Sequence, residues 1–325
     1  MHKMLLNQAR IDLILRPDGP VLIKGGDALT AADPSRPDMA FVRTHRNGHE
    51  TIYFPGSSIK GAIRSHCERI ARTLAFAGNY DAERMACDPL DDEKCCAKVH
   101  GTKTGAVAGD EHTEGDDPSA EDKYRDACFT CQLFGNTTLA GHITFNDAYP
   151  TGEVTLEERN SVAIDRVFGS VRHGPFQFET LVAGEFTTTI RVHNFTCAHL
   201  GLVLLALRDL RDQYLLIGFG KSRGLGRLDA DFTEFTLSSR SAKAGEAVFP
   251  GVARDLTSVY IPQQTGSLRW VAADKDFVSI GGGVQDDFLG HTWVFSGAEA
   301  VESAFKPFRQ AWVDCFRTAK EGTNG

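Results

Sequence analysis

The stretch FPGSSIKGAIRS, residues 54–65, contains the end of a strand, a Gly-Ser-Ser turn and the start of a helix. Ser57 or Ser58 can cap this helix, because a Ser side chain accepts a hydrogen bond from an N–H group of the first turn. Lys60 and Arg64 lie one turn apart on the same face, and the free N–H groups of a helix start attract anions. The stretch therefore predicts a phosphate contact made by these four residues, with an ordinary helix cap as the alternative.

Strand and helix patterns alternate on both sides of this stretch. Apolar and polar residues alternate, as they do in strands, over 10–16, 51–54, 141–149, 185–193 and 226–235. Helical spacing runs from Ser58 to Gly78 and again over 198–214. The principal elements follow the order strand, helix, strand, strand, helix, strand, which is the ferredoxin-like split arrangement. We therefore expect an α+β fold with a ferredoxin-like βαββαβ core over 1–240.

Weaker patterns occur outside these core elements. Asn47-Gly48 is a strong hairpin signal just before the strand TIYF. Residues 241–325 contain short strand patterns, SLRWVAA and HTWVFS, and a predicted helix near 300–318. We treat 241–325 as a C-terminal extension of the core.

The composition limits the class of protein. The chain has 325 residues, of which 42% are apolar and 24% charged, enough for one large or two ordinary domains. No apolar run approaches the roughly 20 residues of a membrane span, and the start MHKMLLNQAR lacks a signal-peptide pattern. We expect a soluble, cytoplasmic protein that contacts no membrane. The 32 glycines favour a loop-rich binding protein over a helical bundle.

The net charge of -8 hides an uneven distribution. Residues 109–126 hold eight acids against two bases, a balance of -6, so the rest of the chain is nearly neutral. Three basic clusters beside glycines stand against this acidic insertion: Lys60, Arg64, Arg69 and Arg72; Arg159, Arg166 and Arg172; Lys221, Arg223 and Arg227. Each cluster is either a set of phosphate contacts or an ordinary solvated face.

The third cluster belongs to GFGKSRGLGRL, residues 218–228, between a predicted helix and a predicted strand. Its glycine spacing is superficially that of a dinucleotide-binding loop, but such a loop follows a strand and opens a helix. A Gly-rich basic loop along a polyphosphate backbone fits this context better. Lys221, Ser222 and Arg223 are its candidate contacts to such a backbone.

Eight cysteines in a chain without a secretion signal point to metal binding or free thiols before disulfides. Cys128 and Cys131 form a CxxC pair, the spacing that suits tetrahedral Zn²⁺. Cys87 with Cys95 or Cys96 can supply the other pair, and His100 is an alternative fourth ligand. We predict a structural zinc site of Cys87, Cys96, Cys128 and Cys131 that ties down an insertion over 79–138. Unpaired surface thiols are the alternative, and we expect Cys67, Cys197 and Cys315 to fill the core.

Three stretches of the chain resemble, in their order and spacing, the signature segments of the RAMP superfamily. They are FPGSSIKGAIRS, CFTCQLFGNTTLAGHITFNDAYP and GFGKSRGLGRL. More closely, they are similar to the backbone subunits of type III CRISPR effector complexes. The resemblance covers about residues 5–240. It implies an RNA-recognition-like core whose copies stack along a guide RNA beside other effector subunits.

The resemblance also implies a catalytic Asp in the loop after the first strands. Asp38 in Pro37-Asp38-Met39-Ala40-Phe41-Val42-Arg43 occupies the matching place, and Asp33 and Asp27 lie in the same loop. In the family this residue acts with a divalent cation, here Mg²⁺ or Mn²⁺. Without the resemblance, any of the three Asp residues is an ordinary turn residue.

A hairpin called the thumb is a further feature that the resemblance implies. It corresponds to about residues 158–182 and inserts between base pairs of the guide–target duplex. Its candidate contacts are Arg166, Val167, Phe168 and Arg172, and the alternative is an ordinary surface hairpin.

We therefore predict a guide-RNA-binding backbone subunit that also cleaves the paired target RNA as a metal-dependent endoribonuclease. One alternative is a binding subunit of the same fold without activity. A second is a guide-processing endonuclease, for which His45, His49 and His173 are available as general acid or base. A zinc-stabilised metabolic enzyme is a remote alternative, since it leaves the basic glycine clusters unexplained.

Overall fold

The structure is a computed structural model. It describes residues 4–25, 37–78, 81–91, 93–99, 119–242, 248–254, 276–281, 284–287 and 290–321. The insertion residues 100–118, the strand pattern at 267–273, and Asp27, Asp33 and His100 lie outside the described residues.

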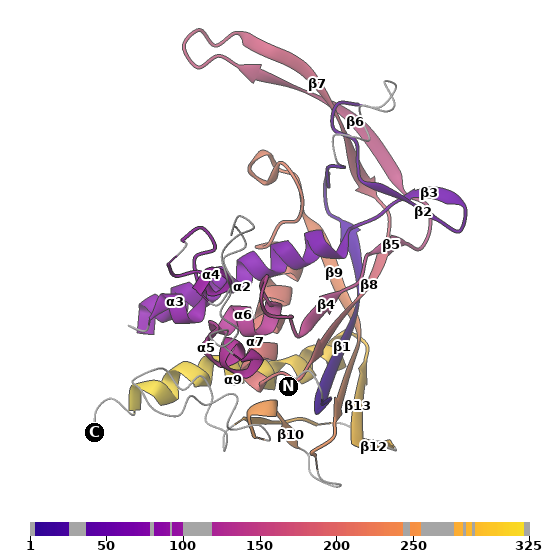
Figure 1. Ribbon diagram of the computed structural model, residues 1–325. Helices are drawn as coiled ribbons and strands as arrows, with labels where there is room; N and C mark the ends of the chain where they lie inside the picture. Colours follow the sequence, from indigo (N-terminus) through magenta and orange to yellow (C-terminus); the bar gives the residue numbers. More distant parts are fainter. Residues whose placement is uncertain are drawn as a thin grey trace, which may run out of the picture.

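A seven-stranded antiparallel sheet forms the centre of the fold (Figure 1). Its order is β12-β13-β9-β1-β8-β4, and β5 also pairs with β8. The strands are β1 Asn7–Pro17, β4 Ile143–Phe145, β5 Tyr149–Pro150, β8 Phe186–His193, β9 Leu228–Ser239, β12 Val284–Asp287 and β13 Gly290–Ser296.

Three long helices lie on one face of this sheet (Figure 1). They are α2 Gly56–Gly78, α7 Cys197–Arg211 and α9 Ala298–Glu321. The side chains of β1 alternate accordingly: Ile11, Leu13 and Leu15 are buried beneath the helices, whereas the residues between them are partly exposed. Alternation of this kind is what a sheet with one covered face requires.

The strand order reveals how the core is connected. Helix α7 joins β8 to β9, and β1 lies between these two strands; α2 leads from β1 towards β4, and β8 lies between them. The four strands of the predicted core thus stand in the order fourth, first, third, second, with every neighbouring pair antiparallel. The α+β fold class predicted from the sequence is confirmed.

The predicted strand over 141–149 is wrong in one respect, because it is broken into β4 and β5. At the break, Asn146 still pairs with β8, where its carbonyl accepts a hydrogen bond from Thr188 Oγ1 at 2.7 Å. Asp147 instead turns towards α2, and its Oδ1 accepts a hydrogen bond from Gly56 N at 2.7 Å. The tertiary contact with the helix start replaces strand pairing at this position.

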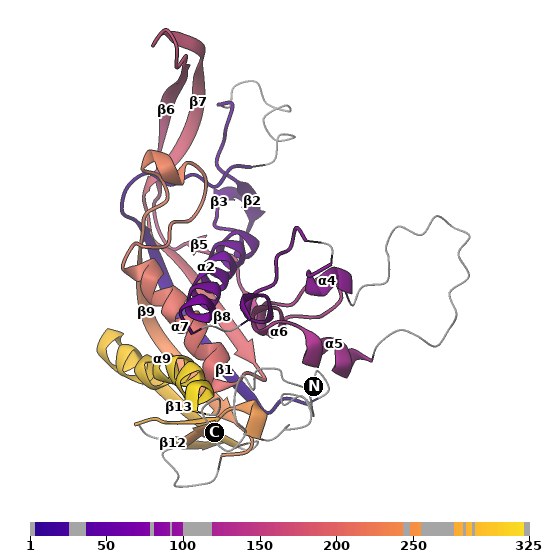
Figure 2. The same cartoon turned by 90° about the vertical axis from the view of Figure 1, so that its left-hand side faces the viewer.

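Two hairpins extend from this body. β2 Arg43–Arg46 and β3 His49–Ile52 are joined by Asn47-Gly48, both at positive φ (53° and 81°), as the sequence predicts for a tight hairpin turn. β6 Thr155–Ile164 and β7 Val171–Ala183 form a long two-stranded hairpin that projects from the body (Figures 1 and 2).

The described part of residues 241–325 completes the sheet and its helical layer. β13 pairs with β9, and α9 packs on α7 so closely that a Cβ on Gly201 would lie 2.1 Å from Phe308 O. The short strands β10 Val248–Pro250 and β11 Phe277–Ser279 pair with each other, and a 3-10 turn over Val252–Arg254 follows β10. Among the described helices, none is long and apolar enough to cross a membrane.

Candidate metal centre and nucleic-acid interface

Four cysteines from three separate segments meet beside α2. Their Sγ atoms all lie within 4.8 Å of one another, and all four residues are buried. They are Cys87, Cys96, Cys128 and Cys131. Short helices carry them or stand next to them in the sequence, and Figure 1 shows these helices grouped beside α2. The helices are α3 Ala82–Met85, α4 Cys96–Val99, α5 Ala120–Asp126 and α6 Phe129–Phe134.

The spacing of the sulfur atoms suits a tetrahedral metal ion. Cys87 Sγ lies 3.7 Å from Cys131 Sγ, too far apart for a disulfide. With Zn–S bonds of about 2.3 Å, two thiolates on a tetrahedral zinc ion stand about 3.8 Å apart. The four-cysteine group can therefore bind a metal ion such as zinc. Zn²⁺ held in this way would tie the three segments together.

Backbone N–H groups also point at the sulfur atoms. Cys87 N donates to Cys128 Sγ at 3.4 Å, and Cys128 N donates to Cys96 Sγ at 3.2 Å. Cys128 is the N-cap of α6, and its Sγ accepts a hydrogen bond from Cys131 N at 3.4 Å. A hydrogen bond from the Cys131 side chain contributes most to lowering the pKa of Cys128 well below its ordinary value. These donors favour the thiolate of Cys128, the form in which cysteine binds metal.

The sequence left the choice between Cys95 and Cys96 open. The structure places Cys96 in the group, whereas Cys95 is buried outside it. Cys67 and Cys197 are fully buried in the main core, as expected, and Cys315 packs against that core.

At the start of α2, one of the N–H groups that the sequence predicts to be free for an anion already has a partner within the protein. Ser57 is exposed and Ser58 half-buried in the first turn, but Gly56 N already donates to the Asp147 carboxylate. A Cβ on Gly56 would lie 2.2 Å from Phe145 O, so the glycine is needed for close packing against β4. The negative charge of Asp147 is an N-terminal cap in the place where an anion was expected.

Lys60 and Arg64 are not equivalent on α2. Lys60 is half-buried, and desolvation, with a further contribution from the Arg64 charge, lowers its pKa. Arg64 turns towards the cysteine group: its Nη1 donates to Gly135 O at 2.8 Å and its Nη2 to Cys131 Sγ at 3.5 Å. These contacts differ from the predicted pairing of Lys60 and Arg64 on one RNA-facing surface.

The Gly-rich loop forms a short 3-10 helix, Lys221–Arg223, between Gly220 and Gly224, which are both in the left-handed region. The side chains of Lys221, Ser222 and Arg223 are exposed, and the Arg223 guanidinium lies 4.9 Å from the ring centroid of Phe219. The loop thus presents two cations and a hydroxyl to solvent.

Asp38 lies beside the middle of β7, where Gln177 pairs with Asn160 of β6. Its side chain is exposed, and its Oδ2 accepts a hydrogen bond from Gln177 N of β7 at 3.1 Å. The residues after it run along β7: Met39 N donates to Gln177 O, and Glu179 N donates to Met39 O. The buried carboxylate of Glu179 then accepts hydrogen bonds from Phe41 N at 2.9 Å and Arg43 Nη2 at 2.6 Å.

Residues 20–25 bring several predicted elements together. Phe219 N of the Gly-rich loop donates to Leu22 O at 2.7 Å, and Val42 N of the Asp38 segment donates to Ile23 O at 2.9 Å. Val21 N donates to Leu181 O of β7 at 2.9 Å. The Gly-rich loop, the Asp38 segment and the hairpin base are therefore joined through one stretch of backbone.

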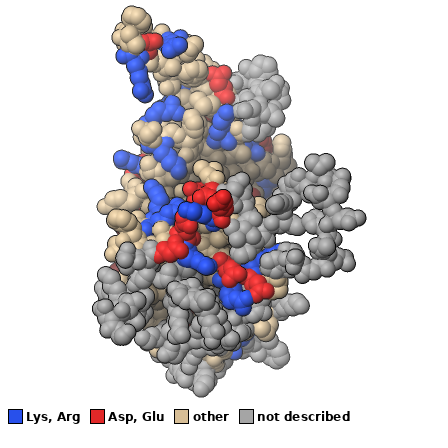
Figure 3. All heavy atoms as spheres, turned by 60° about the vertical axis from the view of Figure 1, so that its left-hand side comes forward, with Lys and Arg blue, Asp and Glu red and all other residues tan. Residues whose placement is uncertain are grey.

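The tip of the hairpin exposes apolar side chains. Val167 and Phe168 are each 83% exposed, and Ile164 is 63% exposed. Arg166 is exposed in the same turn, and Arg172 lies 3.7 Å from Asp165. In Figure 3 the hairpin at the top is largely uncharged, with Lys and Arg atoms near its tip.

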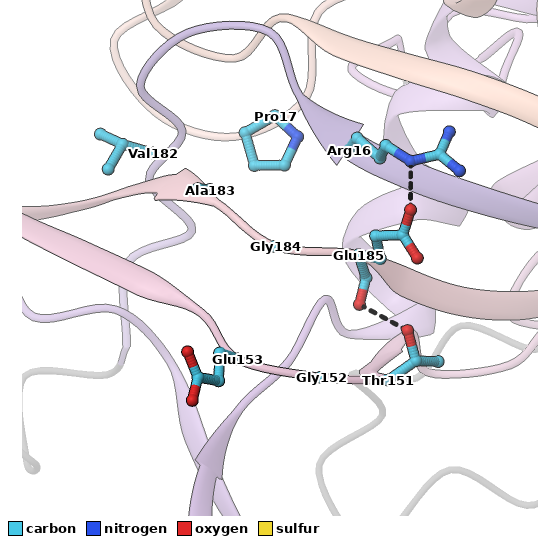
Figure 4. A pocket seen from close by; sticks show the side chains of 9 residues that line it. All are labelled: Arg16, Pro17, Thr151, Gly152, Glu153, Val182, Ala183, Gly184 and Glu185. Atoms are coloured by element: carbon cyan, nitrogen blue, oxygen red, sulfur yellow. Dashed lines mark hydrogen bonds and ion pairs between the residues drawn. The ribbon is translucent and has the colours of Figure 1, made fainter.

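The hairpin leaves the body through two adjacent connections. Residues 151–154 lead into β6 and residues 184–185 lead out of β7, beside an open pocket of about 410 Å³ (Figure 4). Thr151 N donates to Glu185 O at 3.0 Å, and the Glu185 carboxylate accepts a hydrogen bond from Arg16 Nε at 2.6 Å. Gly152 and Gly184 line the pocket.

Sequence reasoning missed the partners of the candidate residues. Gln177 and Glu179 hold the Asp38 segment, and Asp147 caps α2, yet each lies about a hundred or more residues from its partner. Asp147 stands in a string that the sequence analysis singled out, but a strand pattern gives no sign of a cap on a distant helix. The exposed residues His45, His49 and His173 lie on β2, β3 and β7.

Comparison with protein families gives a match over most of the chain. The family model described as the RAMP superfamily matches residues 15–229 of this chain. That range contains α2, the cysteine group, the projecting hairpin and the Gly-rich loop. No curated protein matches the chain.

Proposed function

The chain belongs to the RAMP superfamily, and from this we propose that it is an RNA-binding backbone subunit of a type III CRISPR effector complex in the cytoplasm. Its partners would be a guide RNA, the paired target RNA and neighbouring effector subunits, including copies of itself. We further propose that it cleaves the target RNA.

One observation carries the cleavage proposal. The exposed Asp38 carboxylate is fixed beside the middle of β7 by Gln177 N, on a segment that residues 20–25 connect to the Gly-rich loop. A hairpin that unstacks a nucleotide and a carboxylate held along that hairpin would face the same RNA.

The chemistry is attack of a ribose 2′-hydroxyl on the adjacent phosphate, with departure of the 5′-oxygen of the next nucleotide. A continuous A-form helix does not allow the in-line geometry of this attack, so the tip residues Val167 and Phe168 would displace the nucleotide. Asp38 offers one carboxylate, which suits Mg²⁺ or Mn²⁺ because such ions bind through one or two carboxylates together with substrate phosphates. When bound, this cation would stabilise charge on the phosphate oxygens.

Changing Asp38 to Ala tests this proposal. We expect cleavage of a paired target RNA by the assembled complex to fall on the order of a thousandfold, because loss of a cation-positioning carboxylate raises the barrier by several kcal/mol. Guide and target binding should remain, since cations dominate an RNA interface. Binding is measured by filter retention and cleavage by gel.

Asp27→Ala and Asp33→Ala are controls from the same loop. Loss of activity in Asp33→Ala with activity retained in Asp38→Ala would move the catalytic role to Asp33. Normal cutting by all three variants would leave a binding subunit without this chemistry. Cutting of the guide precursor without metal would favour the processing endonuclease, with His45, His49 and His173 as the next residues to change.

A further inference from the structure

Helix α2 carries a ladder of three charged residues on the side that faces the cysteine group. Arg64, Glu68 and Arg72 follow one another at four-residue spacing, so they lie on one helix face. Glu68 joins the two cations: its Oε1 lies 2.9 Å from Arg64 Nε and its Oε2 lies 3.9 Å from Arg72 Nη2. Each side chain is less than 40% exposed.

The two ends of the ladder hold different halves of the cysteine group. Arg64 donates to Gly135 O at 2.8 Å and to Cys131 Sγ at 3.5 Å, the half that contains the CxxC pair. Arg72 donates to Ala86 O at 3.1 Å and to Cys87 O at 2.7 Å, the other half. One rigid helix thus holds both segments, which also contact each other directly through the hydrogen bond from Cys87 N to Cys128 Sγ.

Charge gives the ladder a second role. Four thiolates around a divalent ion leave a net charge of -2, and burying such a charge is unfavourable unless it is compensated. The guanidinium of Arg64 is the positive group in contact with Cys131 Sγ. Groups around a metal site that bond to its ligands commonly change metal affinity by about 10–100-fold.

We infer that Arg64, Glu68 and Arg72 are positioning residues of the metal centre, which set the separation of Cys87 and Cys131 and offset the charge of the thiolates. Arg64 is accordingly a part of the metal centre and makes no RNA contact. This inference rests on the proposed binding of zinc by the four cysteines.

The test compares Arg64→Gln and Arg72→Gln with Arg69→Gln in the full chain. Arg69 is the matched control because it lies on α2 but donates to His66 Nδ1, at 2.7 Å, away from the cysteine group. Zinc release to a chromophoric chelator should be about 10–100-fold faster in the two ladder variants and unchanged in the control. The Co²⁺-substituted proteins should show altered thiolate absorption bands only in the ladder variants.

A second measurement separates metal positioning from helix packing. Arg64→Gln should lower the thermal midpoint of the zinc-loaded protein, but it should have much less effect when Cys128 and Cys131 are both Ser. Equal losses in the two backgrounds would mean that Arg64 serves only packing and would overturn the inference. Arg64→Lys, which keeps the charge and loses the two-pronged contact, should fall between the wild type and Arg64→Gln in release rate.

An RNA measurement completes the test. Arg64→Gln should leave the salt dependence of guide-RNA binding unchanged, and a flatter dependence would return Arg64 to the RNA interface. If the unaltered protein contains zinc but both ladder variants release it at the wild-type rate, this inference is overturned and the metal centre stands. Unaltered protein that contains no zinc refutes the metal centre, and this inference with it.

Discussion

The cysteine region and the projecting hairpin are both additions to one core, and they treat their apolar residues in opposite ways. The cysteine region closes on itself: Tyr124 and Leu139 are 3% and 7% exposed in a small cluster around the thiols. The hairpin does the reverse, with Val167 and Phe168 each 83% exposed at its tip. Most of β7 outside its last residues is exposed as well.

The difference indicates what each region needs. The helices α3 to α6 have four to seven residues each, too short to be stable alone, so an ion that joins their segments would supply the missing stability. The outer half of the hairpin is a two-stranded ribbon with exposed apolar side chains at its tip, a pattern typical of a surface that meets a partner. One region has the arrangement that a metal ion can stabilise, and the other exposes a surface that a partner can cover.

Removing the metal ligands should have the largest effect on stability. We expect Cys128→Ser combined with Cys131→Ser to abolish zinc binding and to destabilise the protein by on the order of 5 kcal/mol. This loss is smaller than the full binding energy of a zinc finger, because the main hydrophobic core is a separate cluster from the one around the thiols. Metal analysis and thermal unfolding check the result. The control is Cys95→Ser, because Cys95 is a buried neighbour outside the group, and this variant should keep its zinc. Equal zinc content in Cys95→Ser and in the Cys128→Ser, Cys131→Ser variant would refute the assignment of Cys128 and Cys131 as ligands.

Acid should destabilise the layer beneath the cysteine region through His199. This side chain packs on Phe129 of α6, with ring centroids 4.0 Å apart, and burial lowers its pKa from 6.5 to about 3. Between these values the unfolded chain binds the proton and the folded chain does not, so stability falls as the pH falls. The slope is about 1.4 kcal/mol per pH unit, or about 2–3 kcal/mol at pH 4.5.

The measurement is urea unfolding at pH 7 and pH 4.5. His199→Gln should lose less stability between these pH values than the wild type, while both proteins release zinc alike. If the two proteins lost the same stability, proton binding by His199 would not explain the acid sensitivity.

The hairpin tip should behave in the opposite way. Val167→Ser with Phe168→Ser should change folding stability by less than about 0.5 kcal/mol, because both side chains are exposed. Affinity for the target RNA should fall by about 1–3 kcal/mol, the usual contribution of one stacked base. Tyr214→Ser, which removes an aromatic ring that is 77% exposed outside the hairpin, is the control. Equal affinities in the two variants would leave the tip without a role in binding.

The sequence predicted the elements better than it predicted their contacts. α2, β8, α7 and β9 have long and regular periodicity, so their existence followed from local pattern. The break between β4 and β5 did not follow from local pattern, because at this break Asp147 accepts a hydrogen bond from Gly56, 91 residues away at the start of α2. Local pattern contains no information about such a partner.

The candidate sites show the same limit. The CxxC pair predicted a metal centre, but only the fold could choose Cys96 over its neighbour Cys95. Arg64 stands one turn after Lys60, which predicts a shared RNA surface, but local pattern gives no sign of its carbonyl partner 71 residues away. Helix spacing predicts the side of a helix on which a residue lies, and the tertiary fold decides what that side contacts.

The smallest expected effect is on the salt dependence of RNA binding when Lys60, Lys221 or Arg223 is removed. This salt dependence distinguishes these cations from the hairpin tip. Lys60→Ala, or Lys221→Ala with Arg223→Ala, should reduce the slope of log affinity against log salt by about 0.7 for each lost phosphate contact with single-stranded RNA. Only a phosphate contact releases a counterion, so the uncharged Val167 and Phe168 should leave the slope unchanged and lower affinity equally at every salt concentration. Fluorescence anisotropy from about 50 to about 300 mM salt measures both quantities, with a labelled guide RNA for the cations and a labelled target RNA for the tip. A slope that changed with the tip variant, or stayed constant when Lys221 and Arg223 were removed, would contradict this division between an apolar tip and a cationic body.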